Sequence, residues 1–310
     1  MNFIIILLIF CLVLFFYLHI YFQLKTSDDL EIYEIENQTK ERLEEICDLR
    51  QPVVFKYDKN DNMAKINEGC LQSTIVAKYS AFDVKIRNVG NCEKDISNNN
   101  LNDNEDELYI PLSLTNAINV MNEDKKSNYL SEKNADFLEE SGLDKIYKYN
   151  DVFLRPHMVS TCIYDYMFGS KGTQTPFRYE LNYRNYFMVT EGEVKIKMTP
   201  YKSSKYLLPI KDYENFEFRS PINPWNIKEE YKQDFDKIKC LEIILKKGQL
   251  FYLPAYWWYS IEFSEKTTTT SVCCFKYRTY MNIISILDKL FIHFLQSQNI
   301  KRKNINLLKI

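Results

Sequence analysis

The sequence predicts a mainly β fold, flanked by helices and preceded by one membrane-spanning helix. Residues 152–280 form a run of short strand-like segments separated by glycines and prolines. Residues 2–24 are apolar almost throughout, and residues 281–298 are apolar at the i, i+3, i+4 spacing of a helix. A long run of short strands is typical of a closed or double-sheet β architecture.

Residues 2–24 (NFIIILLIFCLVLFFYLHIYFQL) predict an uncleaved membrane anchor, because about 20 apolar residues cross a bilayer as a helix. A cleaved signal peptide is the main alternative. Its usual basic start and small residues before the cut are missing here. The sequence therefore predicts a single-pass membrane protein. Lys25, Lys40 and Arg42 follow the helix, so the positive-inside rule favours a cytosolic body.

Residues 25–49 are charged, with apolar pairs at helical spacing, and predict a stalk and a helix that leads into the domain. Residues 51–56 (QPVVFK) predict the first strand of a β domain over residues 50–280. Residues 98–107 are polar and low in complexity, which predicts a loop. Residues 122–148 carry apolar side chains, Tyr129 and Leu130 among them, at a spacing that predicts helices.

Residues 281–310 predict a C-terminal amphipathic helix and tail. Packing of this helix on the sheet is the simpler role. A homodimer formed through it is the alternative.

The composition argues against two classes of ligand, nucleic acid and zinc. Lys plus Arg (40) nearly equals Asp plus Glu (42), so nucleic acid is not predicted as a partner. The eight cysteines include no Cys-x-x-Cys pair, and no histidine pair has zinc-ligand spacing, so no zinc site is predicted. A chain of 310 residues does not need disulfides for stability, which favours reduced core thiols.

Two separated motifs point to a known family. The first is GSKGTQTPFRYE (residues 169–180), followed in order by Asn185, Gly192 and Pro200. The second is PAYWWY (residues 254–259), followed by a closing strand at residues 271–278. Together they resemble the metal-binding strands of the JmjC and cupin-like oxygenases, over roughly residues 45–290. The resemblance implies a double-stranded β-helix, a form of jelly roll.

The resemblance also implies an iron site that has lost its ligands. In these oxygenases two histidines and one carboxylate hold Fe(II) and leave room for 2-oxoglutarate and oxygen. The matching positions here are Arg178, Glu180 and Tyr259. Glutamate can bind a metal, but a guanidinium offers no lone pair, and a neutral tyrosine is a poor substitute for imidazole. No cofactor is therefore predicted, with Fe(II) and 2-oxoglutarate as the alternative.

The cosubstrate position is altered as well. Val194 stands where the family places a lysine, and its neighbour Lys195 should point to the opposite face of the strand. The same alternation predicts that one of Trp257 and Trp258 faces the core and the other faces outward. If the pocket persists as a ligand site, the resemblance places five residues in it: Thr175, Arg178, Glu180, Trp257 and Tyr259.

Arg178 and Glu180 stand two apart on a predicted strand, so their side chains share one face. If that face lines the barrel, we expect the guanidinium to take the place of the metal and to pair with Glu180, with Tyr259 nearby. The alternative is that Arg178 turns to solvent at the barrel mouth.

Two functions from different classes follow. The first is a membrane-anchored, non-catalytic binding or scaffolding module, whose ligand is an unknown protein or small molecule. The second is an active Fe(II)/2-oxoglutarate-dependent hydroxylase or demethylase with atypical ligands. A third interpretation, a purely structural membrane protein, makes no use of the barrel pocket.

Overall fold

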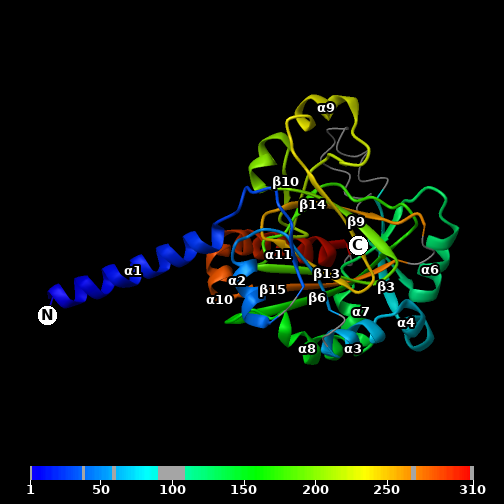
Figure 1. The fold of residues 1–310 in the computed structure, drawn as a ribbon, viewed down its shortest axis with the longest axis horizontal. Coiled ribbons are helices and arrows are strands. Elements are labelled where there is room, and N and C mark those ends of the chain that lie inside the picture. Colours follow the sequence, from blue (N-terminus) through cyan, green and yellow to red (C-terminus); the bar gives the residue numbers. More distant parts are fainter. Residues whose placement is uncertain (1, 37–38, 58–60, 90–108, 267–269, 308–310) are drawn as a thin grey trace.

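The computed structural model describes residues 2–36, 39–57, 61–89, 109–266 and 270–307. Two β-sheets form the body of the molecule, and helices cover the outer faces (Figure 1). Helix α1 (Asn2–Leu24) stands out from this body as a single rod. The loop predicted at residues 98–107 lies outside the described residues.

Within the described residues the larger sheet has nine strands and the smaller has six. The larger sheet runs in the order β1 (Tyr33–Ile35), β2 (Val53–Lys56), β13 (Gln249–Pro254), β8 (Arg184–Glu191), β15 (Ser271–Thr279), β6 (Val159–Gly169), β5 (Tyr129–Ser131), β3 (Asp83–Asn88) and β4 (Ile110–Ser113). The smaller sheet runs in the order β10 (Ile210–Asp212), β11 (Glu217–Arg219), β7 (Arg178–Tyr179), β14 (Trp258–Phe263), β9 (Glu193–Thr199) and β12 (Leu241–Lys246).

The order of these strands confirms the predicted double-stranded β-helix. Strands β6, β8, β13 and β15 lie side by side in the larger sheet, and β7, β9, β12 and β14 do so in the smaller one. The chain therefore passes repeatedly between the two sheets, and the neighbouring strands of each set of four are antiparallel. The hairpin β10–β11 extends the smaller sheet beyond β7.

Strand β9 illustrates how the sequence builds this sandwich. Its residues alternate, so that Val194, Ile196 and Met198 are buried between the sheets, as the two-residue period of a strand requires. Lys195 points to the outer face, where its ammonium group lies 2.8 Å from the Glu262 carboxylate on β14. The prediction that Lys195 faces away from the barrel interior is confirmed.

The outer face of the larger sheet is covered by six helices of the described residues, which bury a second apolar core against it. They are α2 (Lys40–Cys47), α3 (Asp61–Gly69), α4 (Gln72–Tyr79), α6 (Leu114–Glu123), α7 (Ala135–Glu140) and α8 (Leu143–Asn150), with the short 3₁₀ turn η1 (Asp151–Phe153) after them. The smaller sheet is covered by a third apolar cluster and by η2 (Tyr201–Tyr206) and α9 (Glu229–Phe235).

Two local predictions differ from the structure. Tyr129 and Leu130 lie in strand β5 rather than in a helix, because β5 pairs with both β3 and β6 and these partners outweigh the local spacing. Residues 33–35 form β1, which pairs in parallel with β2. The segment predicted to be a stalk is therefore held against the domain, with Gln51 donating to the Asp29 carboxylate at 2.9 Å.

The predicted C-terminal helix is two helices, α10 (Tyr280–Ser285) and α11 (Leu287–Leu307), broken at the buried Ile286. One face packs on the domain, where the His293 ring binds the Tyr213 carbonyl. The opposite face exposes Leu287, Phe291, Phe294 and Leu295. A homodimer through this exposed face stays a prediction.

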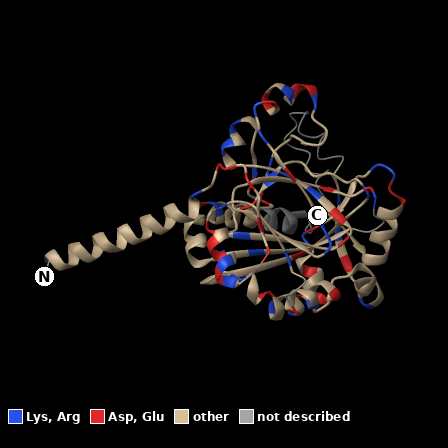
Figure 2. Ribbon diagram, viewed as in Figure 1, with Lys and Arg blue, Asp and Glu red and all other residues tan. Residues whose placement is uncertain are grey.

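Helix α1 is exposed along its length and carries no Lys, Arg, Asp or Glu, whereas both charges are spread over the domain (Figure 2). Its last turn is different, because it packs against the domain. Gln23 is buried, and the Phe22 ring faces the Arg50 guanidinium at 5.1 Å. The seven described cysteines form no disulfide with one another, and four of them are buried: Cys47, Cys70, Cys273 and Cys274. That their thiols stay reduced remains a prediction.

Candidate functional site

A cavity of about 90 Å³ opens at one end of the sandwich, lined by β3, β6 and β15 of the larger sheet and by β7 and β11 of the smaller. We call it the charged cavity, because its lining includes five cations and four carboxylates. They are Arg87, Lys133, Arg178, Arg219 and Lys276, with Glu132, Asp165, Glu180 and Glu217. Buried charges of this number are uncommon unless they are paired, so the pairing decides what the cavity can do.

Arg178 lies on β7 directly opposite Tyr259 on β14. Its guanidinium carbon is 5.2 Å from the centre of the Tyr259 ring, within cation–π range. Its Nη1 donates to Glu132 Oε2 at 2.5 Å, and Arg87 Nη2 lies 2.6 Å from the other oxygen of the same carboxylate. Burial opposes the charge of Glu132, but the two guanidinium groups outweigh it and hold its pKa well below the ordinary value.

Glu180 belongs to a second ion pair. Lys276 on β15 places its ammonium group 2.6 Å from Glu180 Oε1, and the Tyr259 hydroxyl donates to the same oxygen at 3.3 Å. Asn182 donates its side-chain amide to Glu180 Oε2 at 3.2 Å. Burial opposes both charges. Each partner nevertheless stabilises the other, so the pKa of Lys276 is raised and that of Glu180 is lowered.

Asp165 on β6 is held by backbone rather than by a cation. Its two carboxylate oxygens accept the backbone N–H groups of Lys133 and Asn134, each at 2.8 Å. Burial raises the pKa of Asp165. At the rim, Glu217 pairs with Lys133 and lies 3.6 Å from Arg87.

The predicted pair between Arg178 and Glu180 is wrong. Arg178 binds Glu132, and Glu180 binds Lys276. The reason is that the larger sheet lies across the cavity and supplies a closer counter-ion to each residue. Arg178 also does not turn to solvent, since its side chain is only 16% exposed. The expectation that Tyr259 lies beside both residues is confirmed by its ring contact with Arg178 and its hydrogen bond to Glu180.

Three of the five predicted pocket residues, Thr175, Trp257 and Tyr259, lie outside the cavity lining. Tyr259 is buried behind it and reaches Arg178 and Glu180 through the contacts given above. Thr175 is buried, and its hydroxyl accepts the backbone N–H of Ile261 at 2.9 Å, which ties its loop to β14. Trp257 is sealed in the core between the sheets. Trp258 does point to the other face, as strand alternation predicts. It is fully buried there, because η2 covers that face and Ser204 accepts its indole N–H at 2.7 Å.

The residues at the implied iron position do not fit a metal. Arg178 has no lone pair to offer, and both oxygens of Glu180 already accept hydrogen bonds. The ammonium group of Lys276 would lie beside any bound cation. Among the residues that the structure describes, no group of three or more His, Cys, Asp or Glu side chains is placed to hold a metal ion.

Sequence reasoning missed Glu132 and Lys276, the two residues that complete the ion pairs. A signal for Lys276 was present in the sequence. Lys276 is a charged residue in the apolar strand SVCCFKYR, and it stands two residues after the buried Cys274, on the same face of the strand. Glu132 gave no local signal. It lies 46 residues before Arg178, in a segment with helical spacing, and only the pairing of β5 with β6 brings it to the cavity.

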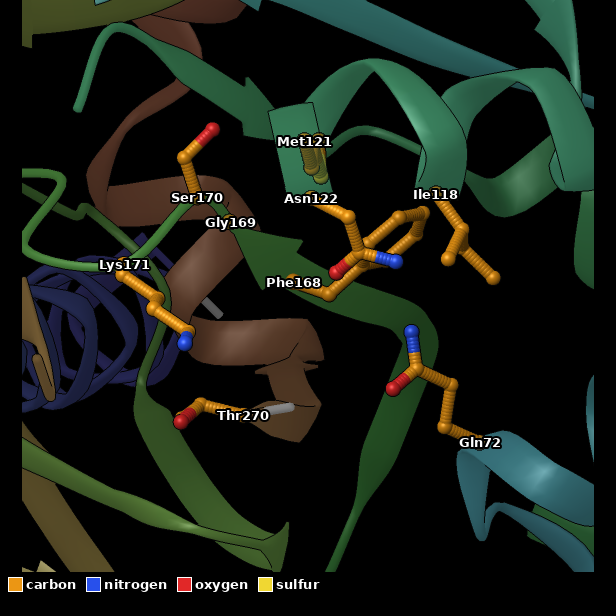
Figure 3. Close-up of a pocket in the computed structure, with 9 residues that line it drawn as sticks. All are labelled: Gln72, Ile118, Met121, Asn122, Phe168, Gly169, Ser170, Lys171 and Thr270. Carbon is orange, nitrogen blue, oxygen red and sulfur yellow. The ribbon is translucent and has the colours of Figure 1, made fainter. Parts of the chain in front are cut away.

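A second cavity lies near the end of β6, between α4 and α6. The amides of Gln72 and Asn122 point toward one another there, beside the Phe168 ring (Figure 3). Its volume is about 10 Å³, which is room for one water molecule. The charged cavity is therefore the better candidate for a functional site.

The fold and the site together define a jelly-roll protein of the cupin kind. The comparison with known families agrees, because the description "cupin-like domain" matches residues 38–278. This match covers most of the chain, and the chain belongs to the cupin-like domain family, of the JmjC type. No curated protein matches the chain.

Proposed function

We propose that this chain is a membrane-anchored, non-catalytic binding or scaffolding module that uses the charged cavity in place of an iron centre. The observation that carries the proposal is the pair of salt bridges at the implied metal position. Arg178 binds Glu132 at 2.5 Å, and Lys276 binds Glu180 at 2.6 Å. A triad position filled by a cation, and a carboxylate already neutralised by a lysine, favour binding over metal catalysis.

The size of the cavity limits what it can take. A volume of about 90 Å³ holds a few water molecules, a small polar molecule, or the tip of one side chain from a protein partner. Its lining can both donate and accept hydrogen bonds, and Phe216 and Phe218 add apolar surface to it. We infer that the ligand is small and polar.

Membrane anchoring by α1 is part of this proposal. Residues 3–24 are long and apolar enough to cross a bilayer, and a signal sequence would meet the same criteria. The packing of Phe22 on Arg50, and the burial of Gln23, favour an uncleaved anchor, because cleavage would remove contacts that the domain makes.

The test is to purify the full-length chain in detergent, load it with Fe(II) without oxygen and measure the bound iron. 2-Oxoglutarate and air, which supplies the O2 that the reaction consumes, are then added, and the succinate formed is measured. We expect iron well below one equivalent and no succinate above a protein-free control. Stoichiometric iron together with turnover would establish the alternative, an active oxygenase with atypical ligands.

A further inference from the structure

A second cluster of buried charge lies where α1 meets the domain. Arg50 follows α2 and is only 2% exposed. Its guanidinium carbon lies 5.1 Å from the centre of the Phe22 ring and 4.5 Å from that of Tyr183. Arg184 on β8 is equally buried and lies 5.1 Å from the same Tyr183 ring. Two guanidinium groups are thus gathered around one tyrosine.

These arginines have hydrogen-bond donors without partners. The Nε and Nη2 atoms of Arg50 are buried with no hydrogen bond, and so are Nε and Nη1 of Arg184. Arg184 pairs with the half-exposed Asp48 through Nη2 at 2.8 Å, whereas Arg50 makes no ion pair with any described residue. Among the described residues only Asp48 forms an ion pair with either of these arginines, and burying an unpaired charge is costly. The arrangement therefore favours an anionic ligand.

The backbone at Arg50 supports a role for its side chain. Arg50 has φ of 61°, in the left-handed region, three residues after α2 ends, where its N–H bonds to the Cys47 carbonyl at 3.1 Å. Glycine is the residue that this position at a helix end favours. Residues other than glycine that are held in this backbone conformation are found often at functional sites.

The cluster lies at the level of the lipid headgroups if α1 spans the bilayer. A helix of 23 residues is about 35 Å long, slightly more than the hydrocarbon core of a membrane. Its last turn, which contains Phe22, then reaches the interface. Arg50 contacts Phe22 and must lie at the same depth. This step rests on the anchoring proposed above.

We propose that Arg50 and Arg184 bind the phosphate group of an anionic phospholipid. Phosphate accepts paired hydrogen bonds from guanidinium groups and neutralises their charge. The exposed apolar side chains of α1, Leu18 and Tyr21 among them, lead from the bilayer to the site and can contact the acyl chains. The lipid would fix the orientation of the domain on the membrane.

The test uses the full-length protein in lipid nanodiscs made of phosphatidylcholine, with or without phosphatidylglycerol of the same acyl chains. Thermal unfolding is followed by the fluorescence of the three tryptophans. We expect phosphatidylglycerol to raise the midpoint temperature of unfolding by roughly 3 °C or more, because a ligand stabilises the state that binds it.

The variant Arg50→Gly should lose most of this increase in the midpoint temperature. Glycine suits the left-handed backbone, so its midpoint in phosphatidylcholine discs should stay near that of the wild type.

Two controls define the site. Arg50→Lys keeps the charge but not the planar fork of donors, so we expect an intermediate shift. Lys25→Gln removes an exposed charge next to α1, and we expect it to keep most of the shift. If Lys25→Gln loses as much as Arg50→Gly, general surface charge explains the effect and the site is refuted. A wild-type chain without any shift also refutes it.

A further measurement distinguishes binding of a lipid headgroup from binding of free inorganic phosphate. Inorganic phosphate, added to phosphatidylcholine discs at the concentration of the lipid phosphate, should leave the midpoint unchanged. An equal, Arg50-dependent shift would assign the site to free phosphate instead. Release of the protein from membranes by alkaline carbonate would refute the anchor and the lipid assignment together. A membrane-retained protein without an Arg50-dependent shift would refute the lipid site alone.

Discussion

Glu132 holds two arginines at once, and the charged cavity depends on it more than on any residue of the implied triad. Its side chain is 4% exposed and bridges Arg87 and Arg178. Removing one partner of a buried ion pair leaves an uncompensated charge, which is far more costly than the pair itself is stabilising. Glu132 thus contributes to stability chiefly by neutralising the two arginines that line the charged cavity.

We expect Glu132→Gln to lower the free energy of unfolding by about 3 kcal/mol at neutral pH. Folding lowers the pKa of Glu132 from its ordinary 4.5, so its contribution is complete above that value and is lost as the pH falls below it. The gap between wild type and variant should therefore narrow on acidification. Urea unfolding of the full-length chain between neutral and acidic pH measures this.

The matched control is Glu229→Gln, which changes an exposed carboxylate on α9 and should alter stability by no more than about 0.5 kcal/mol. A gap for Glu132→Gln that stays constant across the pH range would contradict the proposed role of the charge.

At the scale of elements, strand β15 brings the decisive cation to the site. Cys274 and Lys276 lie two apart on one face of this strand, the first in the core between the sheets and the second in the cavity. The strand that closes the barrel therefore also places a positive charge where a metal would have to bind. Restoring the triad alone leaves this charge in place.

We expect the triple variant Arg178→His, Glu180→Asp, Tyr259→His to bind cobalt(II) poorly. Adding Lys276→Met should strengthen binding at least about tenfold, because a unit charge a few ångströms from the metal opposes it by more than the 1.4 kcal/mol that a tenfold change requires. Titration of the cobalt absorption bands measures the affinity. Lys195→Met, on the outer face of the smaller sheet, is the control and should change nothing. Equal affinities with and without Lys276→Met would contradict this account.

At the scale of the whole molecule, the rod-like α1 and the barrel form one unit, because the last turn of α1 packs on Arg50 and on the domain. The segment after it is held by the pairing of β1 with β2. A domain joined in this way should keep a fixed orientation relative to the membrane. The charged cavity and the pair Arg50 and Arg184 then keep defined positions relative to α1.

We expect the chain to stay in the membrane pellet after alkaline carbonate, with its N-terminus intact by mass spectrometry. A body on the cytosolic side, as the positive-inside rule favours, should be digested by protease added to sealed microsomes. A chain without residues 1–24 is the control and should be released. Cleavage after α1, or protection of the body from protease, would contradict the anchor or its sidedness respectively.

The sequence by itself determined the apolar N-terminal helix, the double-stranded β-helix and the residue types at the three positions that the family resemblance marks. These properties depend on local patterns: a run of apolar residues, alternation along strands, and residue types at motif positions such as Arg178 and Tyr259. Only the tertiary structure decided which charges pair, because Glu132 and Lys276 come from strands far away in the sequence. A carboxylate binds the cation that the folded sheets bring closest, and that distance is not encoded in the spacing of a motif.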